Sequence, residues 1–272
     1  MIKKQVDVFK MNEAIDYYLA NDKSLNYCSK KFNLSYTSLT RYLKKREIKT
    51  KEFDLQTNKY NKHFFETIDT EEKAYWLGFI AADGNICKRN FEIALAIKDK
   101  NHLVKFLEAI DGEEKILKCG FNGKHERARV NIGNVKLVED LKKQGIFERK
   151  SALLEFPKNI KKSLLRHYLR GYFDGDGSIS TNGVNKNGTP KYALNLVASK
   201  EFLVSWSKHL EEELKTTKVV ILSQGIIWKW NKTGINQIKA ILHYLYDDNT
   251  IALERKEKYA EKIFAVLSQK KS

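Results

Sequence analysis

Two aspartates stand at equivalent places in a segment that this 272-residue chain contains twice. Asp83 is the eighth residue of WLGFIAADG, residues 76–84, and Asp176 is the eighth residue of LRGYFDGDG, residues 169–177. Both segments have a glycine, a small residue four positions later, and then Asp-Gly. Because residues at i and i+4 share one face of a helix, two such helices can pack closely through their small residues. The spacing predicts a helix interface made by Gly78, Ala82, Gly171 and Gly175.

The predicted packing would bring the Asp83 and Asp176 carboxylates together at two helix C-termini. Helix C-termini already carry partial negative charge, and two carboxylates about 4 Å apart repel by roughly 1–4 kcal/mol, depending on the local dielectric. A divalent cation would offset that repulsion, and hard oxygen ligands beside phosphates favour Mg²⁺. Two ordinary Asp-Gly helix ends are the alternative, but the shared spacing and the strand pattern that follows both copies favour a site.

Apolar periodicity predicts the elements that must position these aspartates, and their order repeats 93 residues apart. The first copy has predicted helices at residues 73–82, 101–110 and 135–144, and strands at 91–97, 116–121 and 124–132. The second copy has helices at 160–173, 200–214 and 235–246, and strands at 192–198, 219–223 and 226–230. Asp69 to Glu72 form a possible capping box, and Asn122-Gly123 is a strong hairpin signal. The order indicates one duplicated α+β unit and not a solenoid.

The first fifty residues predict a small all-α domain of three short helices at 11–20, 25–32 and 36–46, with Ser24 and Ser35 as N-caps. Leu39 and Leu43 would face inward. A short turn followed by a helix with a polar and basic outer face is typical of a helix-turn-helix; that face would carry Thr37, Ser38, Thr40, Arg41, Lys44 and Lys45. An ordinary three-helix cap is the alternative. The polar residues 51–66 are interpreted as a linker.

The two segments WLGFIAADG and LRGYFDGDG resemble the signature helices of the LAGLIDADG homing endonucleases, in the single-chain form with two motifs. The resemblance implies two pseudo-symmetric αββαββα halves, residues 67–158 and 159–272, with antiparallel sheets over the DNA major groove. It also implies two or more Mg²⁺ ions, with Asp83 and Asp176 as metal-binding carboxylates and the carbonyls of Ala82 and Gly175 as further ligands. The sixth motif position departs from the pattern in the first copy, where Ala81 stands in place of an acid such as Asp174. We expect little loss from this change.

A second repeated element closes each half: IFERK at residues 146–150 and ALERK at 252–256. A lysine at this place in the family is thought to help polarise the attacking water or stabilise charge at the phosphate. The resemblance therefore implies that Lys150 and Lys256 are catalytic, since a cation beside a phosphate lowers the cost of building negative charge there. A solvated charge run is the alternative.

Two predicted strands alternate in a way that suits base reading. Arg127, Arg129 and Asn131 share one face, and apolar residues occupy the other. Lys229 and Asn231 alternate with tryptophans in the same manner. Arginine and asparagine can make paired contacts to guanine and adenine edges, so both faces are predicted to bind DNA. A merely solvent-exposed strand face is the alternative.

The net charge of +16 favours a polyanionic partner, although it is unevenly spread. Residues 1–52 carry a net +6, residues 53–160 only +2, and residues 161–272 +8. The three cysteines form no CxxC pair, and the sequence has neither a signal-peptide core nor 18 consecutive apolar residues. We therefore expect a soluble intracellular protein that is not secreted, from the cytoplasm of a bacterium or phage-infected cell, or from an organelle.

The sequence as a whole predicts a monomeric, Mg²⁺-dependent homing endonuclease that cuts both strands of a long, asymmetric DNA site, in the manner of intron homing. The alternative is a non-cutting protein of the same fold, either an intron maturase acting on RNA or a transcription regulator. Both aspartates are present, which favours the enzyme. An intein is disfavoured, because the sequence begins with Met1 and ends in Gln-Lys-Lys-Ser.

Overall fold

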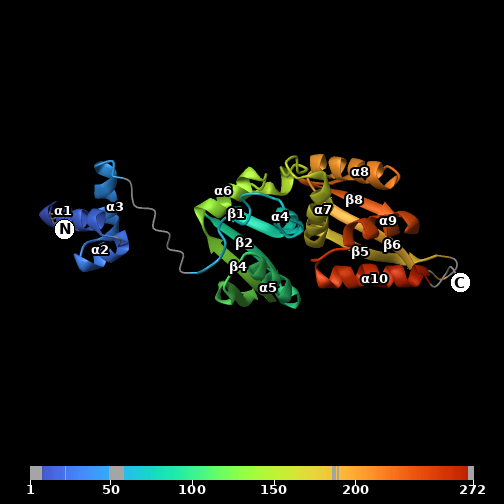
Figure 1. Cartoon of the computed structure of the whole chain (residues 1–272), viewed down its shortest axis with the longest axis horizontal. Helices are drawn as coiled ribbons and strands as arrows, with labels where there is room; N and C mark the ends of the chain where they lie inside the picture. Colours follow the sequence, from blue (N-terminus) through green and yellow to red (C-terminus); the bar gives the residue numbers. More distant parts are fainter. Residues whose placement is uncertain (1–7, 22, 49–57, 186–187, 189, 269–272) are drawn as a thin grey trace. The chain divides into compact units, whose positions relative to one another are not determined.

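The computed structural model describes residues 8–21, 23–48, 58–185, 188 and 190–268, in two units divided between Thr57 and Asn58 (Figure 1). The predicted linker, residues 51–66, falls partly outside the described residues. Its residues 51–57 lie outside the described residues, whereas residues 58–66 pack onto the second unit. Phe64 and Phe65 are buried in that core, and the Asn61 amide donates to the Ile110 carbonyl over 2.6 Å.

The first unit consists of α1 (Val8–Ala20), α2 (Leu25–Lys31) and α3 (Tyr36–Lys45). Ser24 caps α2 as predicted, because its Oγ accepts the Tyr27 amide at 3.1 Å; Ser35 precedes α3 without a side-chain capping bond. The three helices enclose a core of their own, formed by Met11, Ala14, Ile15, Tyr18, Leu25, Cys28, Leu39 and Leu43.

The first half of the second unit begins with α4 (Glu71–Asp83), which Thr70 caps by accepting the Lys73 amide. It continues through β1 (Gly84–Cys87), β2 (Asn90–Ala96), α5 (Lys100–Ala109), β3 (Leu117–Asn122), β4 (His125–Gly133) and α6 (Val135–Lys143). The strands form one antiparallel sheet in the order β1-β2-β4-β3.

The second half repeats this arrangement with α7 (Lys162–Asp176), β5 (Gly177–Val184), β6 (Pro190–Ala198), α8 (Lys200–Leu214), β7 (Leu222–Gln224), β8 (Ile227–Thr233) and α9 (Ile235–Tyr246). Its antiparallel sheet has the matching order β5-β6-β8-β7. The predicted α+β duplication is confirmed. The strands β1 and β5 and the last helix, α10 (Glu254–Ser268), were not predicted. In the described part of the chain, no helix is both long and apolar enough to cross a membrane.

The two halves meet where α4 crosses α7 (Figure 1). A Cβ atom at Gly78 would lie 2.0 Å from the Tyr168 carbonyl oxygen, and one at Gly171 would lie 2.0 Å from the Tyr75 carbonyl oxygen. Farther along, a Cβ at Gly175 would come within 2.3 Å of the Ala82 Cβ. The helix backbones are therefore in direct contact, and a side chain at Gly78 or Gly171 would collide with backbone atoms that cannot rotate away.

Gly171→Ala should destabilise the second unit by about 3 kcal/mol, the upper part of the range for overpacked cores, because the helices must separate. Gly120→Ala is the matched control. Nothing lies within 4 Å of a Cβ there, so we expect a change below about 0.5 kcal/mol. Urea unfolding of both variants measures the difference; equal stabilities would contradict the proposed backbone contact.

Candidate active site

The helix crossing brings Asp83 and Asp176 to one place. They are the last residues of α4 and α7, and the next residue in each case starts the first strand of a sheet. Asp83 reaches across to the partner helix, since its Oδ2 lies 3.4 Å from the position of a Cβ at Gly175. Both carboxylates remain open to solvent on one side. The pair thus forms a small acidic site at the junction of the two halves.

The surroundings of both carboxylates disfavour their charged forms. Burial by neighbouring atoms raises the pKa of Asp83, and it raises the pKa of Asp176 to about 6. The second cause for Asp176 is repulsion from Asp83, while the positive charges of Lys150 and Lys256 act in the opposite direction. Burial therefore disfavours the ionised carboxylates more than the two nearby lysines favour them.

Lys150 and Lys256 cap the carbonyl ends of the two helices. The Lys150 Nζ donates to the carbonyls of Ala82, at 3.0 Å, and Gly84. The Lys256 Nζ donates to carbonyls of the other helix end, namely Phe173 (2.6 Å), Asp174 (2.7 Å), Gly175 (3.5 Å) and Gly177. Lys256 is only 5% exposed, and burial lowers the pKa of both ammonium groups, that of Lys256 to about 8. The alternative of a solvated charge run therefore does not describe these lysines.

The oxygen atoms at this site suit a hard cation that arrives with a phosphate. Among the described residues, no three His, Cys, Asp or Glu side chains gather as a metal site. The protein instead offers two carboxylates, and Mg²⁺ is commonly held by one or two carboxylates together with water and substrate phosphates. The carbonyls of Ala82 and Gly175, predicted as further ligands, each accept a lysine proton. A carbonyl oxygen has a second lone pair, so both can still contribute.

Asp174, the acid at the sixth motif position where the first copy has Ala81, lies inside the protein and not in the acidic site. It is fully buried and accepts three hydrogen bonds, from the hydroxyls of Tyr75 (2.8 Å) and Tyr246 (2.6 Å) and from the Leu253 amide (2.7 Å). Its counterpart Ala81 is a buried apolar residue of α4. The sixth motif position therefore accepts buried hydrogen bonds in the second half and makes only apolar contacts in the first half.

Sequence reasoning missed Arg170, a second polar residue of the crossing. This fully buried side chain donates to the carbonyls of Ile251 (2.8 Å) and Leu245 (3.1 Å) and to Glu71 Oε1 of α4 (2.7 Å). The same Glu71 oxygen accepts the Thr250 amide at 2.9 Å. A charged residue in a helix is usually solvated, so the sequence gives no signal for this burial.

The first sheet presents its predicted reading residues on the open face. Arg127, Arg129 and Asn131 of β4 are exposed, and the intervening Ala128, Val130 and Ile132 are buried. Glu92 of β2 accepts a hydrogen bond from Asn131 at 3.2 Å and lies 3.7 Å from Arg129. Lys118 of β3 stands opposite Arg129 and adds a further exposed cation to the same face.

The second sheet presents a more amide-rich face. Lys229 and Asn231 of β8 are half-buried, while Trp230 faces the core. Asn231 donates to Asn195 Oδ1 at 2.6 Å, and Asn195 in turn donates to Ser180 Oγ at 3.2 Å. Asn195 was not selected from the sequence, because the strand that contains it is mostly apolar. Asn195 joins the candidate DNA-binding face because it pairs directly with Asn231 across the sheet.

In the first unit, most predicted contact residues lie on the surface of α3. Thr37, Arg41, Lys44 and Lys45 are exposed, whereas Ser38 and Thr40 are half-buried. The Thr40 hydroxyl donates to the Tyr36 carbonyl at 2.9 Å. The basic side chains are thus the most available part of this helix.

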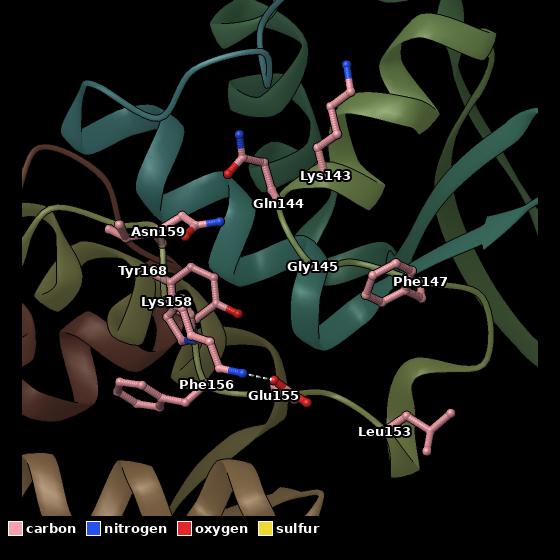
Figure 2. A pocket seen from close by; sticks show the side chains of 12 residues that line it. Lys143, Gln144, Gly145, Phe147, Leu153, Glu155, Phe156, Lys158, Asn159 and Tyr168 are labelled. Atoms are coloured by element: carbon pink, nitrogen blue, oxygen red, sulfur yellow. Dashed lines mark hydrogen bonds and ion pairs between the residues drawn. The ribbon is translucent and has the colours of Figure 1, made fainter.

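A separate pocket lies along the segment that joins the two halves (Figure 2). Its lining includes Phe147, Leu153 and Tyr168, together with a Lys158–Glu155 ion pair of 2.5 Å. The pocket contains neither aspartate and neither capping lysine, so it is distinct from the acidic site.

Asp176→Asn should stabilise the metal-free protein at pH 7 by about 1 kcal/mol, a value reduced to allow for solvent screening. A carboxyl pKa raised to about 6 means that the ionised form destabilises the folded state above that pH. The gain should fade as the pH falls toward about 4, the ordinary aspartate value. Thermal melts at several pH values test this, with the exposed Glu139→Gln as control; a lower melting temperature for Asp176→Asn at pH 7 would refute it.

Sequence comparison with known proteins gives one partial match. No family model matches the chain. The replication factor C small subunit of Methanocaldococcus jannaschii is 30% identical over 123 residues, which make up 44% of this chain and 7% of that protein. The chain thus spans only a small part of that curated relative.

Solved structures match over most of the second unit's length. The LAGLIDADG meganuclease I-AabMI, bound to uncleaved DNA, is similar with a TM-score of 0.52 at 15% identity, covering 75% of this chain and 92% of that one. The I-LtrWI LAGLIDADG homing endonuclease, bound to target DNA, gives 0.52 at 14% identity over 78% and 92%. Meganuclease I-SmaMI, with DNA, gives 0.53 at 12% identity over 75% and 92%. With its two crossed helices and paired four-stranded sheets, the chain has the fold of the LAGLIDADG homing endonucleases.

Proposed function

We propose that this protein is a site-specific endonuclease that uses a divalent metal ion, expected to be Mg²⁺, to cut both strands of DNA. The observation that carries the proposal is the acidic site, where two carboxylates from two crossed helices meet and each helix end is capped by a lysine. The similar solved structures are described as LAGLIDADG enzymes bound to DNA, which supports the same class of substrate.

The proposed chemistry follows from the charges at the site. Asp83 and Asp176 would hold the metal ions, which supply Lewis-acid activation of the phosphate and of the attacking water. Lys150 and Lys256 would place positive charge beside the phosphate as it gains negative charge, and a fixed cation there would lower the barrier.

The two sheets would provide the DNA-binding surface. Arg127 and Arg129 can pair with guanine, and Asn131, Asn195 and Asn231 can pair with adenine. Because the two sheets expose different side chains, a monomer would read an asymmetric site. The excess of basic residues would add salt-sensitive attraction to the phosphates.

Cleavage of a plasmid library with random inserts tests the proposal, with Mg²⁺ present or removed by EDTA. We expect double-strand cuts at one sequence, and a loss of at least about 100-fold in Asp83→Asn and in Asp176→Asn. Asp140→Asn is the control, because this buried carboxylate of α6 pairs with Lys136 and takes no part in the site. A wild-type protein that binds DNA or structured RNA but never cuts would instead support the non-cutting alternative.

We propose that the first unit extends the DNA footprint through the basic surface of α3. The double variant Arg41→Ala/Lys44→Ala should bind a long target more weakly, and the dependence of log affinity on log salt should fall by about 2, one for each lost phosphate contact. The control is the double variant Lys158→Ala/Lys208→Ala, which removes two positive charges from exposed lysines outside α3. Salt titrations that give equal slopes for the two variants would argue against this role.

A further inference from the structure

A buried carboxylate connects the second signature helix to the helix that carries Lys256. Asp174 Oδ2 accepts the Leu253 amide at 2.7 Å, and Leu253 is the residue immediately before α10. The Lys256 amide donates to the Leu253 carbonyl at 2.8 Å, which places the lysine on the first turn of that helix. Whatever fixes Leu253 therefore also fixes the backbone from which the Lys256 side chain extends.

The Lys256 side chain has little freedom to compensate for a shift of this backbone. Its ammonium group is enclosed by carbonyls of residues 173, 174, 175 and 177, and the residue is only 5% exposed. A displacement at the start of α10 would pull the ammonium away from these acceptors and from the acidic site.

Two further helices, α4 and α9, hold the Asp174 side chain in place. The Tyr75 hydroxyl of α4 and the Tyr246 hydroxyl of α9 donate to opposite oxygens of the carboxylate, and Tyr75 also contacts His102 Nε2 of α5 at 2.9 Å. The start of α10 is thus aligned with both halves of the protein through one buried side chain.

The first half is built differently at the corresponding point. Ala81 occupies the position of Asp174, so no side chain there can accept a hydrogen bond. Lys150 lies on a three-residue 3-10 turn, Lys150–Ala152, and follows Arg149 in the left-handed region at φ 56°. Its described contacts at the helix end are the carbonyls of Ala82 and Gly84. The two capping lysines are therefore held by unlike supports.

We propose that Asp174 is a positioning residue for Lys256, so that its loss slows the cutting of only one DNA strand. This inference rests on the proposed endonuclease function. Each lysine caps the helix of its own half, and so each is expected to serve one of the two scissile phosphates.

Two substitutions separate the hydrogen bonds from the charge. Asp174→Ala removes all three acceptor contacts. Asp174→Asn keeps an oxygen for Leu253 and Tyr75, while its amide nitrogen can donate to the Tyr246 hydroxyl. If position is what matters, asparagine restores the function that alanine loses.

Strand-resolved cleavage tests the proposal on the target duplex with a different label on each strand. Lys256→Met and Lys150→Met first identify the strand that each lysine serves. Asp174→Ala should then slow the Lys256 strand by about tenfold or more, since misplacement of a catalytic group is costly, and leave the other strand within about twofold. Asp174→Asn and the control Asp140→Ala should keep the wild-type ratio of the two rates.

Hydrogen exchange provides a second readout that needs no cleavage. The Leu253 amide should exchange at least about tenfold faster in Asp174→Ala than in Asp174→Asn, whereas the Leu154 amide, bonded to the Lys150 carbonyl, should not change. If the alanine variant does not fold, Tyr246→Phe replaces it and should slow the same strand.

Equal slowing of both strands in Asp174→Ala would overturn the inference, and so would an asparagine variant as impaired as alanine. Equal effects of the two lysine variants on both strands would also overturn it. These outcomes require a wild-type protein that cuts. A wild-type protein that never cuts would overturn the endonuclease proposal itself, and unchanged Leu253 exchange would then reject the positioning role independently.

Discussion

Direct contact between the backbones of α4 and α7 is the constraint on which the rest of the structure depends. Gly78 and Gly171 leave no room for even one added carbon, so the helices approach as closely as their main chains allow. Only this approach places Asp83 of one helix beside Gly175 of the other. The sheets follow directly from the helix ends, and their separation and relative orientation are inherited from the same crossing.

The crossing also creates an electrostatic problem. Two helix C-termini and two carboxylates concentrate negative charge at one point. Burial is the first cause of the raised pKa of Asp176, and repulsion from Asp83 is the second. Lys150 and Lys256 relieve the carbonyl ends by donating hydrogen bonds to them, at the cost of burying their own charge. The carboxylate oxygens stay open to solvent, which suits a site whose proposed partners are a cation and a phosphate.

The two halves share a topology but differ in the polar groups that support it. The second half has Arg170 and Asp174 in its signature helix, and both tie the loop before α10 to the helix pair through buried hydrogen bonds. The first half has Leu77 and Ala81 at these positions, and both are buried apolar residues. The two halves thus share a common frame, but each holds its lysine through different contacts and exposes different side chains on its sheet.

The sequence by itself determined the repeated helix ends, the helices α8 and α9 to the residue, and the alternation of β4, because apolar periodicity is a local property. It missed β1, which has four residues, and β5, whose segment GSISTNGV is mostly polar. It missed α10 because this helix is rich in charged residues, and its few apolar side chains become evident only from their packing in the folded protein. Only the tertiary structure decided that Lys256, Arg170 and Asp174 are buried. Their partners lie about 80 residues away in the sequence, and a charged residue is stable inside a protein only where such partners converge.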